Sequence, residues 1–155
     1  MESLASPIRL VLLRVDGQTY ALHLEAVDRI LRMAAITPLP GAPGAVEGII
    51  NIRGEVLAIV SIRRRLGLPH RNVATADSLV VAHTRTRRIA IIAESVLGVA
   101  EFATDAVAGC DDIGRGIQHI EGVVKTSDGL VLIQDLDRFF SVEEEQSLDL
   151  ALEGV

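Results

Sequence analysis

The sequence predicts an all-β fold made of two similar halves. Three observations lead to this prediction: eight short aliphatic runs rich in β-branched residues, turn residues between these runs, and an internal repeat. Hydrophobic residues make up 49% of the chain but aromatic residues only 3%, so the core must consist of Val, Ile, Leu and Ala. A chain of 155 residues is long enough to bury such a core within one domain.

The eight runs have the length and composition of strands and are bounded by turn residues. Asp16-Gly17 and Asp128-Gly129 are hairpin signals, and Arg53-Gly54 joins two runs with Gly54 supplying a positive φ. Many short strands of this kind indicate a barrel or a sandwich. The predicted strands are Ile8–Val15, Thr19–Leu24, Glu47–Ile52, Val56–Val60, Ser78–Ala82, Ile89–Ala93, Ile120–Lys125 and Leu130–Ile133.

Helical spacing is confined to two short pieces. One covers Leu24–Leu31, where apolar residues recur on one side. The other begins at Val142, after a capping Ser141 that is followed by acidic residues. We expect this tail, residues 141–155, to be peripheral, so that truncation after Ser141 leaves the rest folded, at some cost in stability where Leu148, Leu150 and Leu152 pack on it. The Pro-rich piece 37–46 is interpreted as an ordered loop and not as a domain boundary.

An internal repeat relates the two halves of the chain. The block that begins at Val46 aligns without a gap on the block that begins at Ile120, so that Glu47-Gly48 falls on Glu121-Gly122. The block that begins at Tyr20 aligns in the same way on the block that begins at Ile89. The repeat units are about 8–67 and 77–140, with a longer loop around 109–118 in the second. We therefore expect the two halves to form two small barrels.

Each repeat is predicted to end in a short helical turn. Ser61 and Asp135 follow the last strand of the two copies, and both residue types are good helix N-caps. In the first copy Gly67 and then Pro69 end the turn. The run Arg63–Arg65 then lies on successive faces of this turn, and we interpret at least two of the three as ordinary solvated charges.

Charge and composition exclude several classes of protein. A net charge of −6 and four aromatic residues argue against a nucleic-acid partner. The single cysteine, Cys110, cannot form an internal disulfide, and the amino terminus lacks the features of a secretory signal. No apolar run approaches the ~18 residues of a membrane span. We expect a cytoplasmic protein without direct membrane insertion.

No catalytic, metal or cofactor site is predicted. The glycines near 109–116 match no phosphate-binding loop, and Cys110 stands beside carboxylates that would raise a thiol pKa. The acidic run Glu143–Glu145 is interpreted as solvated. The histidines are dispersed without the spacing of a zinc site and are expected to be structural or exposed: His23, His70, His83 and His119.

With these blocks in place, the sequence resembles a CheW-type chemotaxis coupling protein from about Ile8 to Phe140. The most specific element is Asn51-Ile52-Arg53-Gly54, which joins a charged turn to two strands at fixed spacing. The resemblance implies a CheW-like domain over residues 1–140, with two pseudo-symmetric, intertwined SH3-like five-stranded barrels around a shared core. It also implies a non-catalytic adaptor that joins chemoreceptor signalling tips to the regulatory domain of a histidine kinase.

The match to the family's motif assigns five residues to partner binding. Asn51, Arg53 and Gly54 are assigned to a partner-facing turn, and Glu47 and Gly48 lead into it. Receptor tips are implied to lie in a groove between the barrels. The alternative for the arginine of this turn is an ordinary solvated charge. The two flanking aliphatic residues are expected to belong to the core: Ile50 and Val56.

The chain departs from the family pattern at Ser61, where the family usually has Asp. Serine also caps helices, so folding is expected to tolerate the change, whereas a carboxylate contact to a partner could be lost. A specialised adaptor paralogue for a non-chemotaxis kinase pathway therefore remains an alternative. Two other classes remain as rivals: a small-molecule-binding β-barrel and a barrel-fold enzyme.

Overall fold

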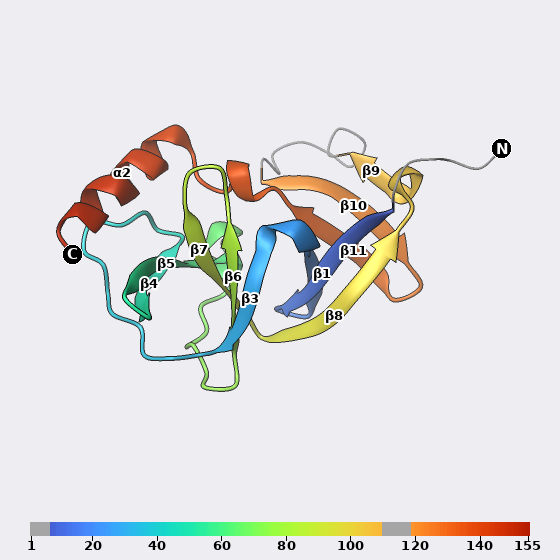
Figure 1. Cartoon of the computed structure of the whole chain (residues 1–155). Helices are drawn as coiled ribbons and strands as arrows, with labels where there is room; N and C mark the ends of the chain where they lie inside the picture. The colour runs from blue at the N-terminus through green and yellow to red at the C-terminus, as the bar shows by residue number, and fades with distance from the viewer. Residues whose placement is uncertain (1–6, 110–118) are drawn as a thin grey trace.

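Two β-sheets dominate the computed structural model, which describes residues 7–109 and 119–155 (Figure 1). One sheet has six strands in the order β8-β1-β2-β11-β10-β9, and the other has five in the order β3-β6-β7-β5-β4. The strands are β1 Ile8–Val15, β2 Gln18–His23, β3 Val27–Arg32, β4 Val46–Ile52, β5 Glu55–Ser61, β6 Ser78–His83, β7 Arg88–Ala93, β8 Ser95–Phe102, β9 Val107–Gly109, β10 Ile120–Thr126 and β11 Gly129–Gln134.

Helical structure is limited to short connections and the carboxyl-terminal segment. Helix α1, Ile62–Arg65, follows β5, and helix α2, Val142–Glu153, follows the last strand. Three 3-10 turns complete the described elements: η1 Leu24–Ala26, η2 Thr104–Ala106 and η4 Leu136–Arg138. An all-β fold with short helical turns and a carboxyl-terminal helix, as the sequence predicted, is confirmed.

The two sheets exchange strands between the repeats. The alignment of the two repeats places β1, β2, β3, β4 and β5 on β6, β7, β8, β10 and β11. The hairpin β1–β2 lies beside β8, β10 and β11 of the second repeat, whereas the hairpin β6–β7 lies beside β3, β4 and β5 of the first. Both sheets thus have the same order of equivalent strands. We call this the exchanged arrangement.

Each hairpin pairs in parallel with a strand of the other repeat. Strand β2 pairs in parallel with β11, with Tyr20 facing Leu132, and β7 pairs in parallel with β5, with Ala90 facing Ile59. The five-stranded sheet is contiguous in sequence from β3 to β7, while the six-stranded sheet is assembled from two separate segments. The chain passes between the sheets at η1 and again at Glu94, between β7 and β8.

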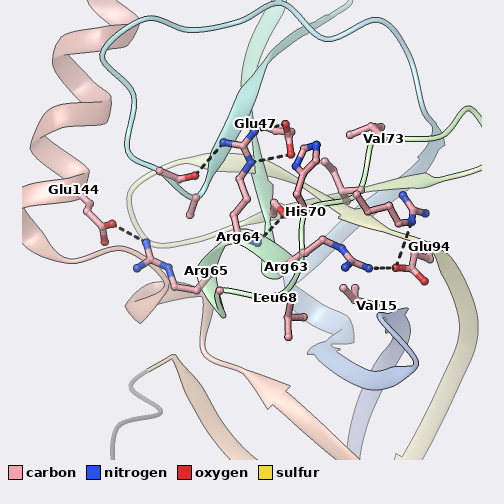
Figure 2. A pocket seen from close by; sticks show the side chains of 16 residues that line it. Val15, Glu47, Arg63, Arg64, Arg65, Leu68, His70, Val73, Glu94 and Glu144 are labelled. Carbon is pink, nitrogen blue, oxygen red and sulfur yellow. Dashed lines mark hydrogen bonds and ion pairs between the residues drawn. The ribbon is translucent and has the colours of Figure 1, made fainter.

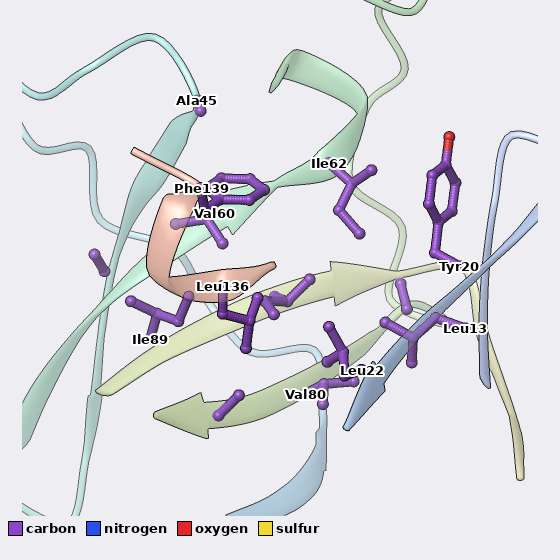
Figure 3. Packing of buried hydrophobic residues seen from close by; sticks show 14 of the residues in the cluster. Leu13, Tyr20, Leu22, Ala45, Val60, Ile62, Val80, Ile89, Leu136 and Phe139 are labelled. Carbon is purple, nitrogen blue, oxygen red and sulfur yellow. The ribbon is translucent and has the colours of Figure 1, made fainter. Parts of the chain in front are cut away.

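Three hydrophobic clusters of described residues form the core. The largest is shared by both sheets: Leu13 and Leu22 of the six-stranded sheet pack in the same cluster as Val80 and Ile91 of the five-stranded sheet (Figure 3). A second cluster lies within the five-stranded sheet and a third within the six-stranded sheet. Aliphatic side chains fill most of these clusters, and the shared one also contains the aromatic side chains of Tyr20, Phe139 and Phe140.

Helix α2 packs on this core through Leu148, one of the three leucines expected to do so, and the outcome of truncation after Ser141 remains a prediction. Leu148 is 0% exposed and belongs to the shared cluster. The helix begins with a complete capping box, in which Ser141 and Glu144 each accept a hydrogen bond from the other's backbone N–H. Glu144 and Glu145, interpreted as solvated, instead form ion pairs with Arg65 and Arg87.

Several finer expectations also need correction. All eight predicted strands are confirmed, but the helix predicted over Leu24–Leu31 is wrong, because only η1 is helical and β3 follows at once. Strands β8 and β9 were not predicted. Within the described residues each sheet has two unpaired ends, so neither is a closed barrel. Cys110 and most of the longer loop of the second repeat lie outside the described residues.

Candidate functional site

The Asn51-Ile52-Arg53-Gly54 segment forms the β4–β5 hairpin. Ile52 faces Glu55 across the ladder, so Arg53 and Gly54 are the two turn residues, with φ values of 51° and 87°. Two consecutive positive φ values match the twist of a two-residue hairpin. The Asn51 side chain fixes this turn, because its Oδ1 accepts a hydrogen bond of 2.8 Å from the Gly54 N–H.

Arg53 itself has no partner within the described part of the chain. Its side chain is exposed, and none of the hydrogen bonds or ion pairs of the described residues includes its guanidinium. A left-handed φ costs a non-glycine residue roughly 1–2 kcal/mol, and Asn or Gly would occupy this position with less strain. The fold therefore gains nothing visible from an arginine here.

Glu47 and Gly48 lie toward the other end of β4 from Arg53, so the predicted residues do not form one cluster. Strands rise about 3.3 Å per residue, which separates Glu47 from Arg53 by roughly 20 Å. Both Glu47 oxygens accept hydrogen bonds from Arg64, at 3.0 and 2.8 Å. This pair attaches β4 to α1, which gives Glu47 a structural role.

Gly48 is required by a close approach between chain segments. A Cβ atom at Gly48 would lie 2.5 Å from the Thr37 carbonyl oxygen, and the same construction at Gly122 puts it 2.9 Å from the Ala108 oxygen. Both glycines follow a register shift in the ladder, between Val46 and Gly48 and at the equivalent place in β10. The repeated Glu-Gly pair is thus explained by packing in both copies.

The predictions for the flanking aliphatic residues and for the two helix caps were each right for one residue and wrong for the other. Ile50 is buried as expected, but Val56 is 37% exposed, so its assignment to the core was wrong. Ser61 caps α1, since its Oγ accepts a hydrogen bond from the Arg64 N–H. Asp135 makes no side-chain cap at η4. The serine that replaces the family's usual Asp therefore performs the capping function.

The interpretation of the arginine run as solvated charge was wrong. Arg63 bridges Asp16 and Glu94, at 3.0 and 2.7 Å, with only 13% of its side chain exposed. Arg64 binds Glu47, and Arg65 binds Glu144 at 2.8 Å. The Arg65 guanidinium also lies over the Phe139 and Phe140 rings.

These ion pairs line the largest of the described cavities, about 590 Å³ in volume (Figure 2). It lies between α1, the loop that follows it, the end of β7 and the start of α2. The arginines that line it are bound to carboxylates of the same chain, and Arg71 pairs with Asp77 in the adjoining loop. The walls therefore combine ion pairs with aliphatic side chains such as Leu68 and Val73, which differs from the mostly apolar lining that is typical of small-ligand sites.

Three carboxylates of this network and its adjoining loop have lowered pKa values. Burial opposes ionisation of Glu94, but the Asp16 N–H and the Arg63 guanidinium outweigh it and hold the pKa of Glu94 below its usual value. The same balance lowers the pKa of Asp77, where Arg71 supplies the charge, and of Glu144, where the Ser141 N–H and Arg65 do so.

Apolar side chains are exposed on the two outer strands β3 and β8. Ile30 on β3 is 47% exposed, and Leu97 and Val99 on β8 are 48% and 58% exposed. The alignment of the repeats places Ile30 on Val99, so the two sheets present an apolar residue at equivalent positions. Each strand is at an end of its sheet. Such exposed apolar edges are typical of protein contact surfaces.

Comparison with known proteins decides the family. The model of the CheW-like domain matches residues 9–144. The chain belongs to the CheW-like domain family. The Rhizobium meliloti (strain 1021) Chemotaxis protein CheW is 27% identical over 140 residues, covering 89% of this chain and 90% of that protein. Protein FrzA of Myxococcus xanthus is 30% identical over 119 residues, covering 74% of this chain and 72% of that protein.

A solved member of the CheW-like family shares the fold. The scaffolding protein TtCheW from Thermoanaerobacter tengcongensis superposes with a TM-score of 0.81 at 22% identity, covering 90% of this chain and 96% of that one. At this identity the likeness shows the fold, while the family rests on the matched domain model and the relatives. Neither of the described α-helices is long and apolar enough to cross a bilayer.

Sequence reasoning located the hairpin but missed the ion-pair network. The CheW-like motif pointed to Arg53, which is the member of the predicted set without a described internal partner. The partners of Arg63 and Arg65 are Asp16, Glu94 and Glu144, which lie far from these arginines along the chain. No local sequence pattern predicts such contacts. Three consecutive arginines in an acidic protein did indicate, however, that carboxylates would lie near them in the fold.

Proposed function

We propose that this chain is a non-catalytic cytoplasmic adaptor that holds chemoreceptor signalling tips and the regulatory domain of a histidine kinase in one complex. Membership of the CheW-like family supports this role, as does similarity to proteins named for chemotaxis and scaffolding. A small-molecule-binding barrel is not favoured, since the largest described cavity is lined by paired charges.

The single observation that supports a contact site is the conformation of Arg53 together with its lack of a described partner. An arginine occupies a left-handed turn position that favours Asn or Gly, its side chain is exposed, and it has no partner among the described residues. Backbone strain that the fold does not use is typical of functional positions. We assign Arg53 to direct partner contact, with Asn51 and Gly54 holding the turn in shape.

The exposed apolar residues supply a second contact surface. A helical receptor tip buries aliphatic side chains when it binds in a groove, with a few polar groups setting the register. Ile30, Leu97 and Val99 offer the aliphatic area on β3 and β8. Arg53 lies on the β4–β5 hairpin, at the opposite end of the five-stranded sheet from β3. Receptor and kinase can therefore be held by different surfaces of one molecule.

The test is the variant Arg53→Glu, measured for thermal unfolding and for affinity to a receptor cytoplasmic fragment and to a kinase regulatory domain. An exposed turn substitution changes stability by less than about 0.5 kcal/mol. A central interface arginine contributes about 2 kcal/mol or more, so we expect roughly a 30-fold loss of affinity for one partner. Val99→Asp is the parallel variant for the apolar surface.

The charge-matched control is Arg138→Glu. Arg138 is exposed, and its side chain has no hydrogen bond or ion pair among residues 7–109 and 119–155. Arg64→Glu is unsuitable because it would break the pair with Glu47. Unchanged affinity of a folded Arg53→Glu protein for both partners would remove this turn from the contact site.

A further inference from the structure

The exchanged arrangement has an alternative that the hydrophobic pattern does not exclude. If each repeat kept its own hairpin, β1–β2 would occupy the place of β6–β7 in the five-stranded sheet, and β6–β7 would occupy the place of β1–β2. The buried residues of the two hairpins are equivalent in character: Leu10 and Leu79, Ala21 and Ala90, and Leu22 and Ile91 are all 0% exposed. Burial alone therefore does not choose between the two arrangements.

Each hairpin tip contacts the helical turn that ends the other sheet. The tip of β1–β2 carries Asp16, whose carboxylate accepts from Arg63 at 3.0 Å and whose N–H donates to Glu94 at 3.0 Å. The tip of β6–β7 carries Arg85, which lies 3.5 Å from the Asp137 carboxylate and whose N–H donates to Asp137 at 2.7 Å. Both contacts connect the five-stranded and six-stranded sheets.

The charges of these two contacts are reversed between the repeats. The alignment of the repeats places Asp16 on Arg85 and Arg63 on Asp137. Each contact is attractive in the exchanged arrangement. In the unexchanged arrangement Asp16 would face Asp137 and Arg85 would face Arg63, so both contacts would be repulsive.

A second set of charges also favours the exchanged arrangement over the unexchanged one. Arg9 on β1 faces Glu101 on β8, and both are exposed; with its hairpin unexchanged, Arg9 would face Arg32 on β3 instead. Opposite charges across a ladder stabilise, and like charges destabilise. Arg88 on β7 bridges Asp28 and Glu55 on the sheet that receives it, as its bonds of 3.0 and 2.8 Å show.

The equivalent of Arg88 on β2 is Thr19, which carries no charge. In the unexchanged arrangement Glu55 would therefore lose its cation, whereas Arg14 would take the place of His83 beside Asp28. Arg87 likewise binds Glu145 and Asp149 of α2, and its equivalent in the other hairpin is the neutral Gln18. The hairpin β6–β7 is thus cationic where its surroundings are acidic.

From these contacts we infer that the charges on the two hairpins specify the exchanged arrangement and reject the unexchanged one. Each pair is partly exposed and contributes little alone, but all of them favour the same pairing of hairpin and sheet. This inference goes beyond the proposed function, because it concerns which half of the molecule each hairpin joins, and it does not depend on any partner.

Two disulfide reporters distinguish the arrangements, each built with Cys110→Ser. In the exchanged arrangement Ile8 faces Phe102. In the unexchanged arrangement Ile8 would face Met33, the repeat equivalent of Phe102. The chains carrying Ile8→Cys with Phe102→Cys, or Ile8→Cys with Met33→Cys, are refolded from denaturant under oxidising conditions, and the disulfides are identified by mass spectrometry.

The test variant is Asp16→Arg with Arg85→Asp, which exchanges the charges of the tips at constant net charge. The matched control adds Arg63→Asp and Asp137→Arg to these two changes. It inverts both contacts, so that they stay attractive in the exchanged arrangement and repulsive in the unexchanged one. We expect the control to form the 8–102 disulfide as the unaltered tips do. In the test variant we expect the yield of the 8–102 disulfide to fall by at least about threefold. We expect the 8–33 disulfide to form instead.

A test variant that forms the 8–102 disulfide as fully as the control, with no 8–33 disulfide, overturns the inference. If the test variant forms neither, the neutral pair Asp16→Asn with Arg85→Gln decides, because it removes the repulsion without adding a clash. Formation of the 8–33 disulfide by the neutral pair supports the inference. Its absence, with a full yield of the 8–102 disulfide, overturns it.

Discussion

Single residues in this molecule divide into those that the fold needs and those that it does not. Asn51 is satisfied within its own turn and Glu47 is satisfied by Arg64, whereas Arg53 has no described internal partner. The motif that pointed to the hairpin combined both kinds of residue. A sequence pattern records spacing, and spacing alone does not separate a turn-forming residue from a contact residue.

His119 is the residue through which acid acts first on stability. It is 9% exposed, its ring lies 6.1 Å from that of Phe139, and one of its ring nitrogens has no partner among the described atoms. Burial lowers the pKa of His119 and the nearby Arg65 charge lowers it further, while the neighbouring Gln134 side chain opposes both. The folded state therefore binds the proton less tightly than the unfolded chain does.

We expect the free energy of unfolding to fall as the pH drops below 6.5, the ordinary pKa of histidine. Below that value the unfolded chain binds more protons than the folded protein, and this favours unfolding. Urea unfolding at about pH 7.5 and 5.5 checks this. His119→Gln should flatten the dependence, whereas the exposed His70→Gln should leave it unchanged. Equal slopes in all three proteins would contradict the assignment.

The carboxylates add their own contribution at lower pH. The pKa values of Asp77, Glu94 and Glu144 are lowered by hydrogen bonds and cations in the folded protein. Their stabilisation is present above their ordinary values of 3.8 and 4.5 and is lost as the pH falls through the lowered ones. The interval between about pH 5 and 6.5 therefore separates the effect of His119 from that of these three carboxylates.

At the scale of elements, the repeated register shifts explain both a success and an error of the sequence-based prediction. Most of the eight predicted strands contain two or more consecutive buried aliphatic residues, which made them recognisable as strands. In β3 the register shifts between Val27 and Arg29. The inserted residue breaks the alternation and leaves Val27, Ile30 and Leu31 at helical spacing. Strand β8 has an equivalent shift and mostly exposed residues, and it was missed.

The glycine of each Glu-Gly pair is expected to be indispensable to its element. In Gly48→Ala the new Cβ would lie 2.5 Å from the Thr37 carbonyl oxygen, so a backbone segment must move. Overpacking of this kind costs about 1–3 kcal/mol of unfolding free energy, measurable by urea denaturation. Gly44→Ala is the control, with no atom within 4 Å of its Cβ and an expected change within about 0.5 kcal/mol. Equal stability of the two variants would contradict the close approach.

At the scale of the whole molecule, the repeat revealed two like halves but not how they combine. Equivalent hairpins have nearly the same apolar pattern, so hydrophobic periodicity could not show that the structure exchanges them. The repeat units of about 8–67 and 77–140 describe the sequence, and as domain limits they remain a prediction. Each sheet draws strands from both units. The deciding contacts are charged pairs between residues far apart in the chain.

A cut between the repeats should therefore leave the molecule intact. Thr75 and Ala76 are exposed in the loop before β6, and a protease site inserted there separates β1–β5 from β6–β11. Because each sheet contains strands from both fragments, we expect the cleaved protein to elute from a sizing column with the uncut one. The two fragments should separate only in denaturant. Separation in native buffer would show that the sheets do not depend on both halves.

The exchanged hairpins also impose an order on synthesis. The hairpin β1–β2 leaves the ribosome first and meets β3, β4 and β5 before β6–β7 has been made. At about 5–20 residues per second, the chain from Ser61 to Ala93 takes roughly 2–6 s to appear. During that interval the nascent hairpin has only the wrong partners, and the like charges of Arg9 and Arg32 already oppose its pairing there. The growing chain thus keeps the place beside β3 and β5 open for the hairpin that is still to come.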